Sequence, residues 1–192
     1  MGKTWVSCRL LEKARAQNLS CYGLKPIAAG CEDTPDGPQN EDARALIAAS
    51  SVKLSYEQVN PIALKAAIAP HIAAADEQRS LSAERLAGYL RGTLMSHKAD
   101  LILVEGAGGW RVPLNNREAL SQLPAIMKWP VILVVGMKLG CINHAILTME
   151  AIHRDGLELA GWIANDFGAP MERLNDNIAT LENIIPAPRI TL

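Results

Sequence analysis

The hydrophobic positions of the chain follow two alternating patterns. Short continuous apolar runs predict buried strands at residues 20–24, 101–104, 130–135 and 159–164. Apolar residues at helical spacing predict helices at residues 4–17, 41–49, 81–97, 117–128, 142–155 and 170–184. Apolar strands that alternate with helices are typical of a parallel sheet with helices on both faces. The pattern therefore predicts an α/β protein.

Two stretches lack a clear period. Residues 30–40 are rich in Gly, Pro, Asp and Asn and predict a loop. Residues 55–75 are rich in alanine and interrupted by proline, which favours a loop with one short helix. The length of 192 residues favours one domain over residues 1–192, with a sizeable core.

Composition and charge exclude several classes of protein. The formal net charge is −1, which gives no reason to expect nucleic acid or an anionic membrane as a partner. No apolar run reaches the roughly 18 residues that span a bilayer, and the N-terminus has no signal-peptide pattern. The four cysteines lack C-x-x-C spacing, as expected of reduced thiols in a cytoplasmic protein.

Polar residues follow several of the predicted strands, and ligands of open α/β sheets bind at those carboxyl ends. They are Lys25, Glu105, Lys138 and the pair Asn165 and Asp166. Polar strand ends occur in many α/β proteins, but this choice of residues favours a nucleotide-phosphate site.

Glu105 opens a glycine-rich turn that contains Gly106, Gly108 and Gly109. Glycines allow the backbone to approach a ligand closely or to take a positive φ. Glu105 is therefore a candidate magnesium ligand beside a phosphate. The alternative is a tight turn with a solvated glutamate.

Gly2, Lys3 and Thr4 precede the first predicted helix and match the end of the phosphate-binding loop G-x-x-x-x-G-K-[ST]. In that loop the lysine reaches the β- and γ-phosphates, the threonine hydroxyl binds magnesium, and N–H groups at the helix start face the anion. The short match is weak alone, and the Glu105 turn strengthens it.

These motifs resemble the dethiobiotin synthetases, in family order and spacing over essentially the whole chain. The most specific segments are Val104–Trp110 and Lys138–His144. The other matching segments are Gly2–Thr4, Gly23–Gly30, Asn40–Ala43, Pro130–Met137, Ala160–Asp166 and Ile185–Pro188. The resemblance implies a P-loop NTPase-type fold and a homodimer. It also implies an ATP-dependent reaction that joins 7,8-diaminononanoate and CO2 into dethiobiotin through a carbamate, with Mg²⁺ as cofactor.

The resemblance also implies roles for particular residues. Lys3 and Lys25 would be catalytic, with Lys3 on the β- and γ-phosphates and Lys25 on the carbamate and the transferred phosphoryl group. Thr4, Asp42 and Glu105 would hold magnesium. Nucleotide binding would use Gly2, Lys3, Thr4, Glu105, Gly106, Gly108, Gly109, Asn165 and Asp166. The substrate would contact Lys25 and the helix start formed by Leu139, Gly140, Cys141, Ile142 and Asn143.

Simpler interpretations stand beside these roles. Lys25 could be a solvated residue at a strand end, and Asp42 could be an acid favoured by the dipole at a helix start. Asn143 could be a capping or core residue. Cys141 is better explained by packing than as a nucleophile, since no basic partner is evident.

Three features depart from the family pattern. The chain starts at the last three residues of the phosphate-binding loop, has Ala29 where the family usually has Ser, and stops at Leu192 before an adenine-side loop. We therefore expect a P-loop domain that is incomplete at both ends and has no first strand. The alternatives are a non-catalytic remnant of the enzyme and a related P-loop ATPase of the partitioning or cobyrinate-amidase type. Asp42 and the segment Lys138–His144 disfavour the related ATPase.

Overall fold

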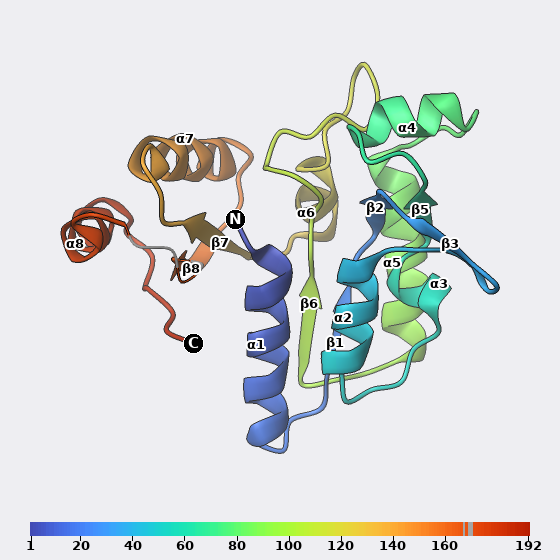
Figure 1. Ribbon diagram of the computed structural model, residues 1–192, viewed down its shortest axis with the longest axis horizontal. Helices are drawn as coiled ribbons and strands as arrows, with labels where there is room; N and C mark the ends of the chain where they lie inside the picture. Colours follow the sequence, from blue (N-terminus) through green and yellow to red (C-terminus); the bar gives the residue numbers. More distant parts are fainter. Residues whose placement is uncertain (167, 169–170) are drawn as a thin grey trace.

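Strands and helices alternate from residue 101 onward, whereas several strands follow one another between residues 21 and 39, as Figure 1 shows. The computed structural model describes residues 1–166, 168 and 171–192. The helices are α1 (Lys3–Ala16), α2 (Glu41–Ala49), α3 (Tyr56–Val59), α4 (Pro70–Asp76), α5 (Ala83–Ser96), α6 (Gln122–Met127), α7 (Cys141–Arg154) and α8 (Leu174–Ile184). The strands are β1 (Cys21–Leu24), β2 (Ile27–Ala29), β3 (Glu32–Thr34), β4 (Gly37–Gln39), β5 (Ile62–Leu64), β6 (Leu101–Val104), β7 (Val131–Gly136) and β8 (Leu159–Asn165).

The strands pair mostly in parallel. β1 pairs with β6, β2 with β5 and β7 with β8, all in parallel, whereas β3 and β4 form an antiparallel hairpin. Parallel pairs joined by helices confirm the predicted α/β class. Among the described residues the strands form separate two-stranded sheets rather than one continuous sheet.

Apolar side chains gather in two large cores. The first packs β1, β2 and β5 against α2, α4, α5 and α6, and the second packs β7 and β8 against α7 and α8. A smaller cluster joins α1 and α2 to β1 through Leu11, Cys21 and Leu46. In Figure 1, α1 stands between the two larger groups.

A cleft of about 460 Å³ is lined by residues of both β6 and β7. Ile102 and Val104 line it from β6, and Ile132 and Val134 from β7. This explains one difference from the sequence analysis. The run 101–104 predicts a buried strand, but every residue of β6 is only half-buried, and the last three of them, Ile102–Val104, line the cleft.

Other elements differ from the sequence predictions for local reasons. The predicted loop 30–40 contains the β3–β4 hairpin, and β2 and β5 are strands that no apolar pattern predicts, since each has only three residues. The predicted helix 117–128 is shorter in the structure, where only α6 (Gln122–Met127) is helical. The Asn115 side chain accepts hydrogen bonds from the N–H groups of Arg117 and Glu118, which holds a turn where the helix would begin.

The stretch 55–75, predicted as a loop with one short helix, instead holds α3, β5 and most of α4. The remaining predicted elements are confirmed to within a few residues. The predicted helix 170–184 is present as α8, although its expected start at Pro170 lies outside the described residues. In the part of the chain that the structure describes, no helix has the length and apolar character needed to cross a membrane.

Packing around β1 leads to a stability prediction. A Cβ atom at Gly23 would lie 2.8 Å from Leu46 Cδ2 and 3.1 Å from Leu11 Cδ1. We expect Gly23→Ala to lower the free energy of unfolding by about 1–3 kcal/mol, because it over-packs the junction of α1, α2 and β1. Urea unfolding would measure the change.

Gly92→Ala provides the matched control. A Cβ atom at Gly92, in α5, meets nothing within 4 Å among the described residues. This substitution should raise the free energy of unfolding by about 0.5–1 kcal/mol through helix propensity. A Gly23→Ala variant as stable as the unaltered chain would contradict the close packing.

Candidate active site

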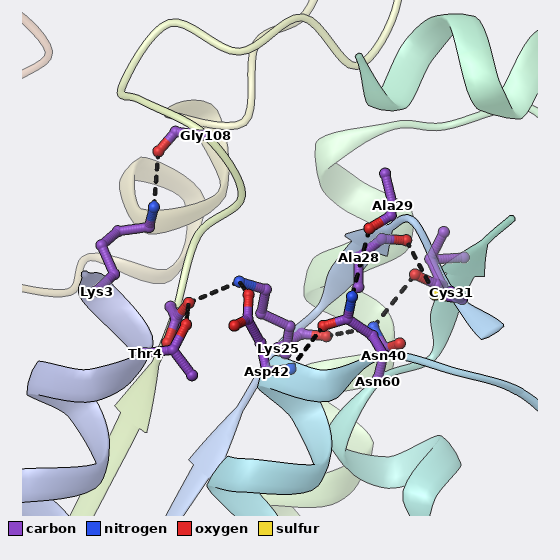
Figure 2. A network of polar contacts seen from close by, with 12 residues as sticks. Lys3, Thr4, Lys25, Ala28, Ala29, Cys31, Asn40, Asp42, Asn60 and Gly108 are labelled. Carbon is purple, nitrogen blue, oxygen red and sulfur yellow. Dashed lines mark hydrogen bonds and ion pairs between the residues drawn. The ribbon is translucent and has the colours of Figure 1, made fainter. Parts of the chain in front are cut away.

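Candidate site residues meet where β1 and β6 end. The register places Leu24 opposite Val104, and the Glu105 N–H donates to the Leu24 carbonyl at 2.8 Å. The residues that follow the two strands, Lys25 and Glu105, are therefore neighbours. Figure 2 shows the Lys25 side chain beside Thr4 from the start of α1 and Asp42 from the start of α2.

Lys25 lies between two carboxylates. Its Nζ is 2.6 Å from Glu105 Oε1 and 2.9 Å from Asp42 Oδ2. The side chains of Lys25 and Glu105 are 5% and 3% exposed, whereas that of Asp42 is 42% exposed. The simpler interpretations of a solvated lysine and a solvated glutamate are therefore wrong. The strand ends instead carry a buried ion pair with a third charge at its edge.

Asp42 occupies the first turn of α2. The Asn40 side chain accepts from the Asp42 N–H at 3.0 Å and begins the helix. Burial raises the pKa of Asp42, but the hydrogen bond and charge of Lys25 outweigh it, so the pKa is lowered overall. Asp42 is thus an acid at a helix start, as its simpler interpretation holds, and also a partner of Lys25.

Thr4 joins the same group from α1. Its hydroxyl donates to Glu105 Oε1 at 2.8 Å. The other carboxylate oxygen, Glu105 Oε2, is buried and has no hydrogen-bond partner among the described residues. A buried carboxylate oxygen without a partner is costly, so this atom is available to a cation.

The donor set suits magnesium. Within the described part of the chain, no three His, Cys, Asp or Glu side chains gather as a complete metal cage. Magnesium does not need one, because proteins commonly hold it through one or two carboxylates while phosphates and water supply the remaining oxygens. Asp42, Glu105 and the Thr4 hydroxyl meet that requirement.

Lys3 connects α1 to the glycine turn. Its Nζ donates to the Gly108 carbonyl at 2.9 Å. Burial lowers the pKa of Lys3, and the positive charge of Lys25 lowers it further. Two ammonium groups thus lie near each other, and an anion bound between them would relieve their repulsion.

The glycine turn leaves its backbone donors free. Among the residues that the structure describes, no N–H from Gly106 to Arg111 donates to a backbone carbonyl. Gly108 has φ 63°, and a Cβ atom there would lie 2.8 Å from Val112 Cγ2, so the turn requires glycine at this position. The turn can therefore present N–H groups to a ligand.

The predicted adenine residues lie at the end of β8. Asn165 is buried, and its Nδ2 donates to the Met1 carbonyl at 3.0 Å. Asp166 is exposed and accepts from the Gly168 N–H. The structure thus brings Asn165 to the start of the chain, close to Gly2.

The segment predicted to bind substrate begins α7 and divides into exposed and buried residues. Leu139 is 98% exposed, and Gly140 and Asn143 are also exposed. Cys141 is buried in the second core, which supports the packing interpretation of this residue. Lys138 and Cys141 line the same cleft as Lys3 and Glu105, so this helix start and the phosphate-binding candidates share one opening.

The sequence analysis assigns no role to two asparagines that contact the backbone near the site. The Asn60 Nδ2 donates to the Lys25 carbonyl at 2.7 Å and Asn60 is buried, so it fixes the backbone that carries Lys25. Asn40 also donates to the Ala29 carbonyl at 3.3 Å. The pattern Asn40-Glu41-Asp42 carries a helix-start signal that predicts the role of Asn40, but nothing in the sequence marks Asn60.

Comparisons with known proteins show which family this chain is similar to. A family model described as an AAA domain matches residues 1–191. The chain is 60% identical to an ATP-dependent dethiobiotin synthetase BioD of Cellvibrio japonicus, over 97% of this chain and 81% of that protein. It is 53% identical to the protein of that name from Pseudomonas aeruginosa strain UCBPP-PA14, over 98% and 82% of the two chains. The BioD 1 protein of Escherichia coli O157:H7 is 46% identical, over 98% and 83%. The comparisons do not favour the related partitioning or cobyrinate-amidase class.

The buried ion pair leads to a second stability prediction. Lys25→Met should lower the free energy of unfolding by about 3–5 kcal/mol, because it leaves the buried Glu105 carboxylate without its cation. Replacing both residues in Lys25→Met/Glu105→Met should recover much of that loss, since neither buried charge remains. Chemical denaturation of the two single variants and the double variant measures the coupling. Strictly additive losses would show that the two side chains do not depend on each other.

Proposed function

The chain belongs to the family of ATP-dependent dethiobiotin synthetases, and we propose that it closes the ureido ring of dethiobiotin from 7,8-diaminononanoate, CO2 and MgATP. One observation carries the residue assignment. Lys25 is held between Glu105 and Asp42 while Thr4 shares the Glu105 carboxylate, so two carboxylates, a hydroxyl and a lysine meet at one site.

The proposed reaction has three steps. One amine of the substrate adds to CO2 and loses a proton, which gives a carbamate. A carbamate oxygen then attacks the γ-phosphorus of ATP and displaces ADP. Finally the second amine attacks the carbonyl carbon of this mixed anhydride, loses a proton and expels phosphate as the ring closes.

Charge is the main obstacle to this reaction, because a carbamate and a triphosphate are both anions. Phosphoryl transfer depends mostly on positioning and on neutralising charge. Lys3 would bind the β- and γ-phosphates, and the ammonium of Lys25 would stabilise the carbamate and the phosphoryl group in transfer. Thr4, Asp42 and Glu105 would hold Mg²⁺, which would neutralise phosphate charge.

Further residues would orient the two substrates. Gly2 and the turn glycines Gly106, Gly108 and Gly109 would offer backbone N–H groups to the phosphates. Asn165 and Asp166 would face the adenine, where the Asn165 amide oxygen would accept from the exocyclic amine. The helix start Leu139–Asn143 would bind the substrate carboxylate through its N–H groups and the helix dipole.

A homodimer is part of the proposal. Leu139, just before α7, is 98% exposed, and Leu147, within α7, is 55% exposed. Large exposed apolar side chains at the start of a helix and along it favour a covered surface. A second copy packed on α7 would cover both and would bring its own substrate-binding segment to the interface.

The function and its metal site are tested by one set of assays. Purified chain, 7,8-diaminononanoate, bicarbonate and MgATP should yield dethiobiotin with one ADP for each product molecule, measured by mass spectrometry and a coupled ADP assay. Asp42→Asn should lower turnover by about 100-fold or more, because metal placement and charge neutralisation are lost.

Glu41→Gln is the matched control, since Glu41 also lies in the first turn of α2 but is exposed. Its turnover should stay within about twofold of the unaltered chain. No dethiobiotin from the unaltered chain would refute the proposed function. Equal turnover in Asp42→Asn and Glu41→Gln would refute only the metal assignment.

A further inference from the structure

A polar contact ties the glycine turn to the far end of α7. Asp155 follows the last residue of that helix, and its Oδ2 accepts from Trp110 Nε1 at 2.8 Å. Arg111 donates to both carboxylate oxygens at 2.7 Å, from NH1 to Oδ2 and from NH2 to Oδ1. Two parallel bonds from arginine to a carboxylate fix orientation as well as distance. We call Trp110, Arg111 and Asp155 the turn clamp.

The stability of α7 does not explain an acid at this position. Asp155 is the C-cap of the helix, where the helix dipole disfavours negative charge. The charge of Arg111 compensates for that, and the Asp155 side chain is only 19% exposed. Burial raises the pKa of Asp155, yet the hydrogen bonds from Arg111 and Trp110 lower it overall. The carboxylate is thus held in its charged form by the turn.

The turn depends on side chains for its position. As noted above, the N–H groups from Gly106 to Arg111 donate to no backbone carbonyl in the described chain. Trp110 packs against the second core, whereas Ala107 and Val112 pack against the first. Arg111 NH1 also donates to the Ser121 hydroxyl at 3.0 Å, and Ser121 is buried. The turn therefore bridges two cores, and the clamp fixes it to the second one.

The opposite side of the turn meets the phosphate-binding candidates. Lys3 donates to the Gly108 carbonyl, two residues before Trp110. A shift of Trp110 and Arg111 would therefore move Gly108 and its neighbours relative to Lys3. Errors of about 1 Å in positioning can cost on the order of 100-fold in turnover, even when they start far from the reacting atoms.

We propose that Asp155 is a positioning residue for the nucleotide, acting through Trp110 and Arg111 to hold the Gly106–Gly109 turn against the triphosphate. This rests on the proposed function to the extent that the turn contacts ATP. Asp155 itself touches neither substrate. Its effect should therefore appear in MgATP affinity and leave the KM for the diamine substrate unchanged.

Calorimetric titration with MgATP tests the proposal. The binding stoichiometry gives the fraction of folded molecules, so a change in Kd can be told apart from a loss of folded protein. Asp155→Ala should raise the Kd for MgATP about tenfold. Asp155→Asn should raise it less, because the amide oxygen still accepts from Trp110 or Arg111. Adding Arg111→Met to Asp155→Ala should cause little further loss, since the two residues act as one unit.

Glu84→Ala is the control, because Glu84 forms an exposed ion pair with Arg91 at 3.4 Å on α5. Its Kd for MgATP should equal that of the unaltered chain. An unchanged Kd in Asp155→Ala with a lower unfolding midpoint would overturn the proposal and leave the clamp as a structural tie.

A milder variant covers the case in which Asp155→Ala does not fold. Trp110→Phe keeps the ring in the second core and removes only its N–H donor, so it should raise the Kd about threefold. An unchanged Kd there would again overturn the proposal, as would a failure of the unaltered chain to bind MgATP. If the unaltered chain binds MgATP but forms no dethiobiotin, the proposed function is refuted. The positioning role of Asp155 is then still supported by the Kd values of its variants for MgATP.

Discussion

The ammonium of Lys25 between Glu105 and Asp42 is the interaction on which the site depends. Two charges with side chains 5% and 3% exposed are tolerable only as a pair with good geometry. The β1–β6 register supplies that geometry, because it sets Leu24 opposite Val104 and so makes the next two residues neighbours. Asn60 then fixes the Lys25 backbone. The residues that follow β1 and β6 and the start of α2 thus meet at Lys25 Nζ.

In the described part of the chain, the two large cores are linked through the start of α1 and through the glycine turn, and candidate site residues make several of these contacts. Lys3 reaches Gly108, Asn165 reaches the Met1 carbonyl, and the turn clamp connects the β6 turn to α7. Between β6 and β7 lies an apolar cleft whose opening includes Lys3 and Glu105. A ligand bound at that opening would touch elements from both cores, so binding and the relative position of the cores should influence each other.

The sequence predicts the parts of this fold that have a strong period. The runs at β6, β7 and β8 and the spacing of α5 and α7 identify their elements, because each pattern extends over several residues. Three-residue strands such as β2 and β5 carry no such signal. In the site, a strand-end position predicts Lys25 and Glu105 but gives no hint of Asn60 or Asp155. Those two act through contacts between segments 35 and 44 residues apart, which no local pattern encodes.

Two groups of opposite charge, the Glu105 carboxylate and the Lys3 ammonium, lack full compensation in the site. Glu105 Oε2 is buried without a partner in the described chain, which leaves a polar atom unsatisfied unless a cation binds it. Lys3 has a lowered pKa because burial and the charge of Lys25 disfavour its ammonium, which an anion would reverse. A divalent cation bound together with a polyphosphate compensates both groups at once, and MgATP is such a ligand. The same charges that make the site costly to fold therefore support the proposed chemistry.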